Sequence, residues 1–309
     1  MNYLEQRSHL LTEQVNPNSE NLDLLSNEEI VDLFNREDAK TIEAIAKARQ
    51  PLARAIELTS VALGQGGRLF YIGAGTSGRL GVLDAAECPP TFCTPPEMVR
   101  GIIAGGEPAL VKSSENLEDS SSDGAEIIVK NQVNKLDIVI GITAGGTTPF
   151  VRGALARAKE LAATTVFISC VPSAQVESDA DLDIRLLTGA EILAGSTRLK
   201  AGTVTKMALN IISTGAMIRL GKVYGNRMVD VAVTNQKLRD RALNIIEDLT
   251  ELDRNCASQL LEKSQGSVKL ALLMHWKKLD RNCASQLLEK NQNNLRIALN
   301  SNKSSHKNV

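Results

Sequence analysis

The amino-acid sequence predicts an α/β fold with a central, mainly parallel sheet, followed by a small helical module. Short apolar runs alternate with helical patterns over residues 69–186, which is typical of a parallel sheet covered by helices on both faces. After residue 235 the apolar runs stop and only helical periodicity remains. Hydrophobic residues make up 43% of the 309-residue chain but aromatic residues only 3%, so aliphatic side chains must fill the core.

The N-terminal part of the chain predicts an arm followed by helices. Residues up to about 25 are polar, and NPNS at 16–19 indicates a turn or an extended arm. SNEE at 26–29 is a capping box, which predicts a first helix over 28–35. A second helical pattern extends from 42 to 63, and we expect Pro51 to split it near Gln50.

Five short apolar runs, each bounded by Gly, Pro, Ser or Asp, are the predicted strands. They cover residues 69–72, 99–104, 136–142, 165–169 and 182–186. In parallel sheets, ligands bind beyond the carboxyl ends of the strands, in the loops that lead to helices. The two loops richest in glycine and hydroxyl groups follow the first and the third run, so the sequence predicts a binding site there.

A direct repeat marks the C-terminal part of the chain. LDRNCASQLLEK occurs at 252–263 and again at 279–290, and each copy predicts a short helix, a turn and another helix. Two copies are too few for a solenoid, so we expect a small helical module. The predicted organisation is an arm with helices at 1–56, an α/β domain at 57–220 and this module at 221–309.

Composition and charge exclude several classes of function. The net charge is −1 without a basic patch, so we expect no nucleic-acid partner. No apolar run approaches the ~18 residues of a membrane span, and the start lacks a signal-peptide pattern. Five cysteines, an odd number, fit reduced thiols in the cytoplasm, and their spacing predicts no metal site.

The first candidate loop, GAGTSG at 73–78, formally matches the dinucleotide motif G-x-G-x-x-G. That interpretation fits poorly, because the next predicted strand ends in glycines at 105–106 and not in the acid that would hold a ribose. Gly75, Thr76 and Ser77 could instead bind an anion or a sugar at the start of a helix. The alternative is a tight strand-to-helix turn that needs its glycines for geometry alone.

The second loop, GITAGGTTP at 141–149, combines backbone amides with hydroxyl groups. Thr148 and Pro149 predict a helix start, with the threonine as N-cap. No lysine follows as it does in a P-loop, which disfavours a nucleotide triphosphatase. Two such loops suit a phosphosugar, one for phosphate and one for sugar hydroxyls. The candidate phosphate ligands are Thr143, Gly145, Gly146, Thr147 and Thr148.

A third segment, residues 189–206, holds further candidates for substrate binding. Ser196 and Thr197 can cap a helix that continues to residue 218. Glu191, Ser196 and Lys200 lie close to this cap in the sequence and are the candidate ligands. A capped amphipathic helix with a solvated charged face explains the same pattern equally well.

Among the carboxylates, Glu87 is the best candidate for an acid. Its neighbours, AA before it and CPP after it, carry no charge, which favours a protonated carboxyl that can donate a proton. Glu118 is one of several acids at a polar helix start, and by the residues alone it belongs to the solvated surface. The three histidines lie outside the α/β segment, so covalent catalysis through a Ser-His or Cys-His pair is disfavoured.

These segments together resemble the N-acetylmuramic acid 6-phosphate etherases, lyases of the sugar isomerase (SIS) superfamily. The most specific match is the stretch 73–92, and the likeness extends from about residue 4 to 300. The other matching segments are TEQ at 12–14, NPNS at 16–19, GGRL at 66–69, GIIAGG at 101–106, residues 191–206 and NRMVDV at 226–231.

The resemblance implies removal of D-lactate from N-acetylmuramic acid 6-phosphate, in amino-sugar catabolism and peptidoglycan recycling. The family reaction is elimination across C2–C3 of the opened sugar, then addition of water, without cofactor or metal. It assigns the proton donor to Glu87 and a second catalytic carboxylate to Glu118, in place of the surface interpretation. It also implies a SIS-type three-layer sandwich, a sugar-phosphate-binding catalytic domain at 57–220 and a homodimer.

The second loop departs from the family pattern. Many relatives have AASGRTP where this chain has TAGGTTP at 143–149, so that Gly145 replaces a serine and Thr147 an arginine. We expect phosphate binding to survive through Thr143, Thr148 and the loop amides. The main alternative function is a non-catalytic sugar-phosphate-binding regulator similar to glucokinase regulatory protein, and a SIS isomerase is a weaker one.

Overall fold

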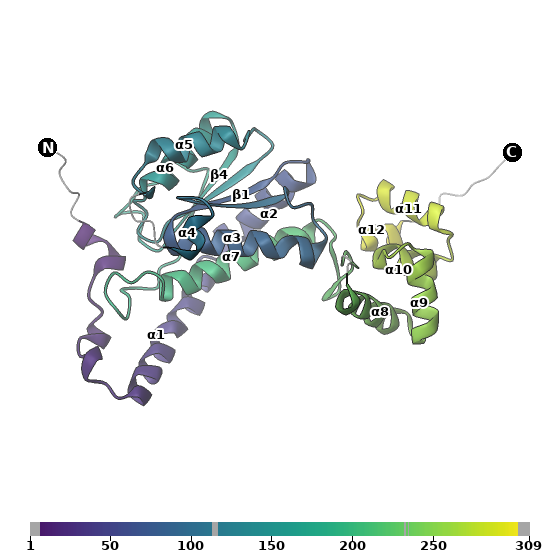
Figure 1. Cartoon of the computed structure of the whole chain (residues 1–309), viewed down its shortest axis with the longest axis horizontal. Helices are drawn as coiled ribbons and strands as arrows, with labels where there is room; N and C mark the ends of the chain where they lie inside the picture. Colours follow the sequence, from purple (N-terminus) through teal and green to yellow (C-terminus); the bar gives the residue numbers. More distant parts are fainter. Residues whose placement is uncertain (1–6, 113–116, 232, 234, 302–309) are drawn as a thin grey trace. The chain divides into compact units, whose positions relative to one another are not determined.

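The computed structural model describes residues 7–112, 117–231, 233 and 235–301. They fall into two compact units (Figure 1). The first unit comprises Met1–Ala86 and Pro96–Gly215, and the second comprises Glu87–Pro95 and Ala216–Val309. None of the helices in these ranges is long and apolar enough to cross a membrane.

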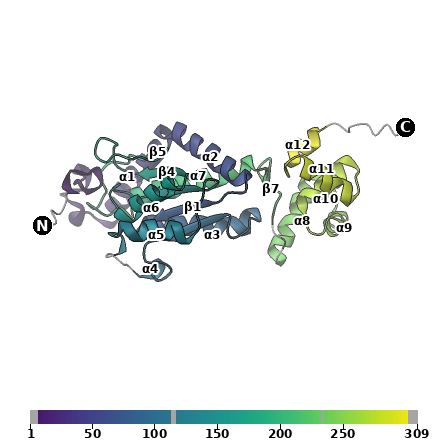
Figure 2. The same cartoon turned by 90° about the horizontal axis from the view of Figure 1, so that it is seen from above.

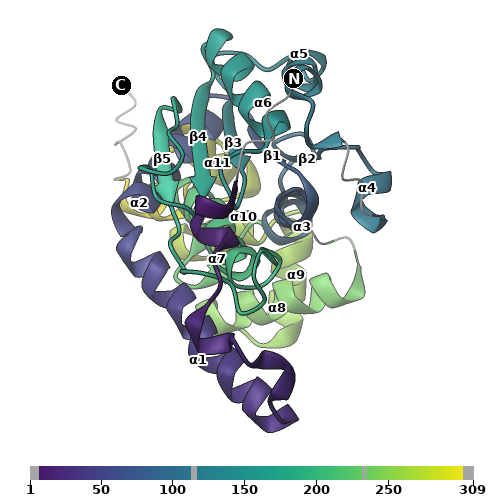
Figure 3. The ribbon, with the colours of Figure 1, turned by 90° about the vertical axis from the view of Figure 1, so that its left-hand side faces the viewer.

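The first unit is built on a five-stranded, fully parallel sheet, which confirms the predicted α/β class. Its strands are β1 (Leu69–Gly73), β2 (Val99–Ile103), β3 (Ile138–Ile142), β4 (Thr164–Ser169) and β5 (Leu182–Arg185). Their order is β2-β1-β3-β4-β5, as Figure 3 shows. Each predicted strand lies within two residues of the observed one at both ends.

Strand β1 lies between β2 and β3, so the strand order reverses there. In sheets of this order the ligand site lies at this switch point, beyond the carboxyl ends of the strands. Gly73 at the end of β1 pairs with Ile142 at the end of β3. The two glycine- and hydroxyl-rich loops therefore leave the sheet side by side, each at the carboxyl end of a strand as the sequence predicted.

Helices cover both faces of the sheet and make three layers (Figures 1 and 2). Helices α5 (Ser121–Lys130) and α6 (Pro149–Glu160) pack on the face that carries Phe70, Val139 and Phe167. The opposite face carries Tyr71, whose hydroxyl bonds to Asp84 of α3. The helices there are α2 (Arg49–Gly64), α3 (Gly75–Phe92) and α7 (Lys200–Arg219), and a short helix, α4 (Pro108–Val111), follows β2.

The N-terminal part folds into four 3-10 turns and a long helix. The turns are η1 (Arg7–His9), η2 (Leu11–Glu13), η3 (Pro17–Ser19) and η4 (Leu22–Leu24). Helix α1 (Asn27–Lys47) begins with the predicted capping box at Ser26. The prediction that it ends at residue 35 is wrong, because its buried face continues to Ala44. The expected break near Gln50 falls at Ala48, the residue between the end of α1 and the start of α2.

The C-terminal part of the second unit consists of helices and one short hairpin. The hairpin pairs β6 (Val223–Tyr224) with β7 (Arg227–Met228) and was not predicted. The repeat forms helix, turn and helix twice, as expected, with Asp253 and Asp280 as equivalent N-caps. The helices are α8 (Gln236–Thr250), α9 (Arg254–Lys263), α10 (Val268–Lys277), α11 (Arg281–Lys290) and α12 (Leu295–Asn300).

Two glycines bring α5 and α6 into direct backbone contact. A Cβ atom at Gly124 of α5 would lie 1.9 Å from the carbonyl oxygen of Phe150. Conversely, a Cβ atom at Gly153 of α6 would lie 2.0 Å from the carbonyl oxygen of Ser121. This contact fixes the start of α6, which follows the second loop.

We predict that Gly153→Ala lowers the free energy of unfolding by about 2 kcal/mol, measured by urea denaturation. Alanine is the better helix former by about 1 kcal/mol, so helix propensity alone predicts the opposite sign. Glu126→Ala on the exposed side of α5 is the control and should change stability by less than about 0.5 kcal/mol. A Gly153→Ala protein as stable as the wild type would contradict the backbone contact.

Candidate functional site

The first loop is a tight turn from β1 into α3. Gly75 has a left-handed φ of 51°, which favours glycine. A Cβ atom at Gly73 would lie 2.6 Å from the amide nitrogen of Gly78, so geometry alone requires this glycine. Thr76 and Ser77 lie in the first helical turn and are half-buried. The loop therefore meets the demands of a tight turn and also presents hydroxyls at a helix start.

The second loop places two threonine hydroxyls in contact. Oγ1 of Thr143, a residue only 3% exposed, lies 2.8 Å from Oγ1 of Thr148. Thr148 occupies the N-cap position of α6, as predicted, but its hydroxyl pairs with Thr143 instead of capping a helix amide. Gly145 and Thr147 are half-buried and Gly146 is buried, with a left-handed φ of 78°.

The third segment folds differently from the prediction. Helix α7 begins at Lys200, and its cap is the Glu191 carboxylate and not Ser196 or Thr197. The two oxygens of Glu191 accept hydrogen bonds from the amides of Lys200 and Ala201 at 3.0 and 2.9 Å. Burial raises the pKa of Glu191, although these amides favour its charged form. Ser196 is half-buried in the preceding loop.

The start of α7 packs against the first loop. A Cβ atom at Gly202 would lie 3.4 Å from Cγ2 of Thr76. The structure therefore brings the third segment to the first loop, although more than 100 residues separate them in the sequence. The side chain of Lys200 is fully buried, and its Nζ lies 2.5 Å from Oε2 of Glu37.

Glu118 lies beside the second loop. Its carbonyl oxygen accepts a hydrogen bond of 3.0 Å from the amide of Phe150, in the first turn of α6. The residue is half-buried, which differs from the fully solvated position that its neighbours in the sequence suggested. The structure thus places this acid at the carboxyl edge of the sheet.

Glu87 lies near the end of α3 and has an exposed side chain. It belongs to the segment Glu87–Pro95, which groups with the second unit. The apolar residues beside Glu87 in the sequence therefore do not bury its carboxyl group in this structure. Its assignment as proton donor stays a prediction.

A buried polar network around Glu37 was missed by the sequence analysis. Glu37 is 2% exposed and also accepts hydrogen bonds from Asn16 at 2.8 Å and from Asn18 at 2.9 Å. Burial opposes the charged form, but the hydrogen bonds from Lys200, Lys40, Asn18 and Asn16 outweigh it and lower the pKa of Glu37 to about 2. The NPNS motif at 16–19 was the only sequence signal for this network, but the sequence did not indicate that its asparagines bind Glu37.

This network anchors residues 7–19, here called the N-terminal arm, to the third segment. Asn16 also donates to the carbonyl oxygen of Ala190 at 3.2 Å. Oγ of Ser19 donates to the carbonyl oxygen of Ile192 at 2.7 Å. The arm is therefore part of the wall beside the candidate site.

A half-buried acid, Asp84 of α3, also escaped the sequence analysis. It accepts hydrogen bonds from Tyr71 at 3.0 Å and from Ser213 at 3.1 Å. Burial raises its pKa despite these bonds. Asp84 therefore joins α3, β1 and α7 behind the site.

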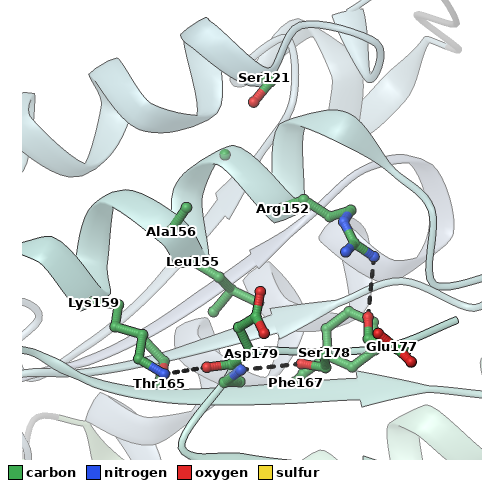
Figure 4. Close-up of a pocket in the computed structure, with 12 residues that line it drawn as sticks. Ser121, Arg152, Leu155, Ala156, Lys159, Thr165, Phe167, Glu177, Ser178 and Asp179 are labelled. Atoms are coloured by element: carbon green, nitrogen blue, oxygen red, sulfur yellow. Dashed lines mark hydrogen bonds between the residues drawn. The ribbon is translucent and has the colours of Figure 1, made fainter. Parts of the chain in front are cut away.

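A cavity of about 330 Å³ lies beside α6, and Figure 4 shows the residues that line it. Its two cations already have protein partners. Arg152 donates to the carbonyl oxygen of Glu177 at 3.3 Å, and Lys159 donates to that of Asp179. Its lining contains none of the residues of the two loops. In the described ranges, no cluster of three or more His, Cys, Asp or Glu could hold a metal ion.

A parallel sheet in this order, covered by helices on both faces, is a doubly wound α/β fold, and the family models narrow it to the SIS type. The family model for the glucokinase regulatory protein N-terminal SIS domain matches residues 51–159. The model for the C-terminal lid domain of glucokinase regulatory protein matches residues 225–275.

Curated relatives define the family more narrowly. The N-acetylmuramic acid 6-phosphate etherase of Gloeothece citriformis is 72% identical over 275 residues, covering 89% of this chain and 90% of the relative. The etherase of Trichodesmium erythraeum is 69% identical over 276 residues, covering 89% and 90%. The chain belongs to the N-acetylmuramic acid 6-phosphate etherase family, which confirms the resemblance seen in the sequence.

Solved structures of similar fold are more distant in sequence. A phosphoheptose isomerase from Francisella tularensis is 17% identical, with a TM-score of 0.45 over 61% of this chain and 97% of that one. The phosphoheptose isomerase GmhA from Neisseria gonorrhoeae is also 17% identical, with a TM-score of 0.45 over 62% and 97%.

We predict that Glu37→Gln lowers the free energy of unfolding by about 3 kcal/mol in urea denaturation. It removes the ion-pair partner of the buried Lys200 cation, and breaking a buried pair from one side costs about that much. Glu57→Gln is the matched control, because it removes the exposed ion pair with Arg54. Its effect should stay below about 1 kcal/mol. The double variant Glu37→Gln/Lys200→Met should recover part of the loss.

The wild type and Glu37→Gln, compared over a range of pH, also test the pKa of Glu37. Its folded pKa of about 2 lies below the ordinary 4.5, so the carboxylate stabilises the fold fully above pH 4.5. That stabilisation is lost as the pH falls toward 2, and the difference between wild type and Glu37→Gln should shrink over this range. A difference that stays constant down to about pH 3 would contradict the ion pair.

Proposed function

We propose that this protein is a carbon–oxygen lyase that cleaves the D-lactyl ether of N-acetylmuramic acid 6-phosphate. The products are N-acetylglucosamine 6-phosphate and D-lactate. The observation that carries this proposal is about 70% identity, over about 90% of both chains, to proteins that bear the name of this activity. The regulator alternative is not favoured, because these relatives are etherases.

The loop after β3 is the proposed phosphate site. The Thr143 and Thr148 hydroxyls, the amide of Gly145 and the positive end of α6 offer donors to one dianion. Gly146 shapes the loop, because its own amide donates to the carbonyl oxygen of Thr143 at 3.2 Å. Thr147 adds a further hydroxyl at the same loop. We propose that hydroxyl groups and the loop backbone take the place of the arginine that many relatives have at this loop.

The loop after β1 is the proposed sugar site. Gly75, Thr76 and Ser77 open α3 next to the phosphate loop, because β1 and β3 end at the same level. We place Glu191, Ser196 and Lys200 on the α7 side of the sugar, where Gly202 contacts Thr76. Lys200 would act there through its ion pair with Glu37.

The reaction needs proton transfers at carbon and oxygen. Once the sugar ring opens, the aldehyde at C1 acidifies the proton on C2, which a base removes. The lactate oxygen then leaves C3 with a proton from an acid, and a C2–C3 double bond forms. Water adds its oxygen to C3 and a proton returns to C2. We assign Glu87 as the acid and Glu118 as the second carboxylate, following the family.

We further propose a homodimer that acts in the cytoplasm, in amino-sugar catabolism and peptidoglycan recycling. The odd number of cysteines supports a reducing compartment. The family resemblance supports the homodimer and the assignment of residues 57–220 as the catalytic domain.

D-lactate release from N-acetylmuramic acid 6-phosphate tests the activity and the two acids. We expect release by the wild type and a loss of about 100-fold or more in kcat for Glu87→Gln and Glu118→Gln. Glu57→Gln is the control and should retain the wild-type rate. Absence of D-lactate with the wild type would overturn the proposed function. Full activity of Glu87→Gln would overturn only the assignment of the acid.

Thr143→Ala tests the phosphate site. A hydrogen bond to a charged group is worth about 1.5–3 kcal/mol, so we expect KM to rise by about 10-fold or more with a small change in kcat. Thr143→Ser keeps the hydroxyl and should keep a KM close to that of the wild type. If Thr143→Ala leaves KM unchanged, phosphate is not bound through this hydroxyl.

A further inference from the structure

The part of the N-terminal arm around η2 is held firmly against the carboxyl edge of the sheet. Leu10 is 1% exposed and packs with Val171 and Val176, in the segment after β4. The amide of Leu11 donates to Oε1 of Gln175 at 2.9 Å. Asn16 and Ser19 fix the other end of the arm to residues 190–192. The residues between these anchors, Thr12 and Glu13, thus have defined positions.

Thr12 carries a buried hydroxyl group that lacks a partner. The residue is 2% exposed, and its Oγ1 makes no hydrogen bond with any residue that the structure describes. Buried polar groups are nearly always hydrogen-bonded, because a donor removed from water without a partner destabilises the fold. A bound substrate group would supply the missing partner.

The hydroxyl of Thr12 faces the second loop. The nearest atom to a Cβ built on Gly145 is Oγ1 of Thr12 at 3.6 Å, followed by Cδ1 of Leu10 at 3.8 Å. Because Gly145 has no side chain, this hydroxyl lies directly beside the loop backbone. It thereby lies at the same loop that carries the hydroxyls of Thr143 and Thr148.

The neighbouring residue, Glu13, faces the third segment. Its Oε2 lies 3.1 Å from the position of a Cβ on Gly195. Two consecutive arm residues therefore contact two separate binding segments, one through a hydroxyl and the other through a carboxylate. A phosphoryl dianion takes hydrogen bonds from donors, so Thr12 is the residue of the two that can bind it.

We propose that Thr12 is a substrate-binding residue whose hydroxyl donates a hydrogen bond to a phosphoryl oxygen of the sugar phosphate. This proposal rests on the proposed function of the loop after β3 as the phosphate site. It makes the N-terminal arm a wall of that site.

Thr12→Val, which keeps the shape and removes the hydroxyl, is the main test. KM for N-acetylmuramic acid 6-phosphate should rise at least about 10-fold, with kcat changed less than about 2-fold. The melting temperature without ligand should stay equal or rise, because the unpartnered hydroxyl is gone. Thr12→Ser should restore the KM of the wild type. An unchanged KM in Thr12→Val would overturn the proposal.

Thr59→Val is the matched control. Thr59 of α2 is fully buried, and its Oγ1 also lacks a partner among the described residues. The same chemical change there should affect the melting temperature in the same direction and leave KM unchanged. An equal rise in KM for both variants would assign the effect of Thr12→Val to altered packing and overturn the proposal.

Inorganic phosphate separates this proposal from the proposed function, because its binding needs no turnover. We expect phosphate to raise the melting temperature of the wild type and to raise that of Thr12→Val much less. This result would support the role of Thr12 even if the wild type released no D-lactate. Equal upward shifts in the two proteins, or none in the wild type, would count against it.

A double-mutant cycle with Gly145→Ser tests the position of the hydroxyl. A serine fits there, because its Cβ meets Thr12 and Leu10 only at ordinary contact distances. Its own hydroxyl would lie beside that of Thr12 and offer a second donor. Thr12→Val should therefore raise KM by a smaller factor in the Gly145→Ser background, and equal factors in both backgrounds would contradict the placement.

Discussion

The hydrogen-bond register between β1 and β3 sets the geometry on which the rest of the first unit depends. Parallel pairing of Gly73 with Ile142 ends both strands at one level. Because β1 also pairs with β2, the chain leaves the sheet in opposite directions on the two sides of this point. Two loops, the starts of α3 and α6 and the backbone of Glu118 therefore converge there, while the rest of the sheet provides support.

The sequence was sufficient for the sheet and for the loops. Strands buried on both faces appear as short apolar runs, and glycines with positive φ or a close backbone approach leave a visible mark, as at Gly73 and Gly75. These signals are local, so they can be recognised in a single sequence before any tertiary contact is known. The family resemblance added the chemistry, which periodicity could not supply.

Contacts between residues far apart in the sequence could not be predicted from local patterns. Glu37 and Lys200 are 163 positions apart, and each alone has the pattern of a solvated charge on a helix. Glu191 was predicted as a ligand, but in the structure it caps α7. This cap was not predicted, because a carboxylate nine residues before a helix gives no capping signal in the sequence. The hydroxyl of Thr12 had no assigned role for the same reason, since its neighbour Gly145 is known only from the fold.

The carboxylate of Glu37 in α1 binds both the arm, through Asn16 and Asn18, and Lys200, the first residue of α7. These contacts join the segments before the α/β domain to its interior. The family model for the SIS domain starts at residue 51, after the arm and α1. A chain shortened to that boundary would still contain all five strands of the sheet and both loops. It would nevertheless leave an ammonium group in an interior position with its counter-ion deleted. The interior of the α/β domain therefore depends for its charge balance on the arm and on α1, which lie outside the family model.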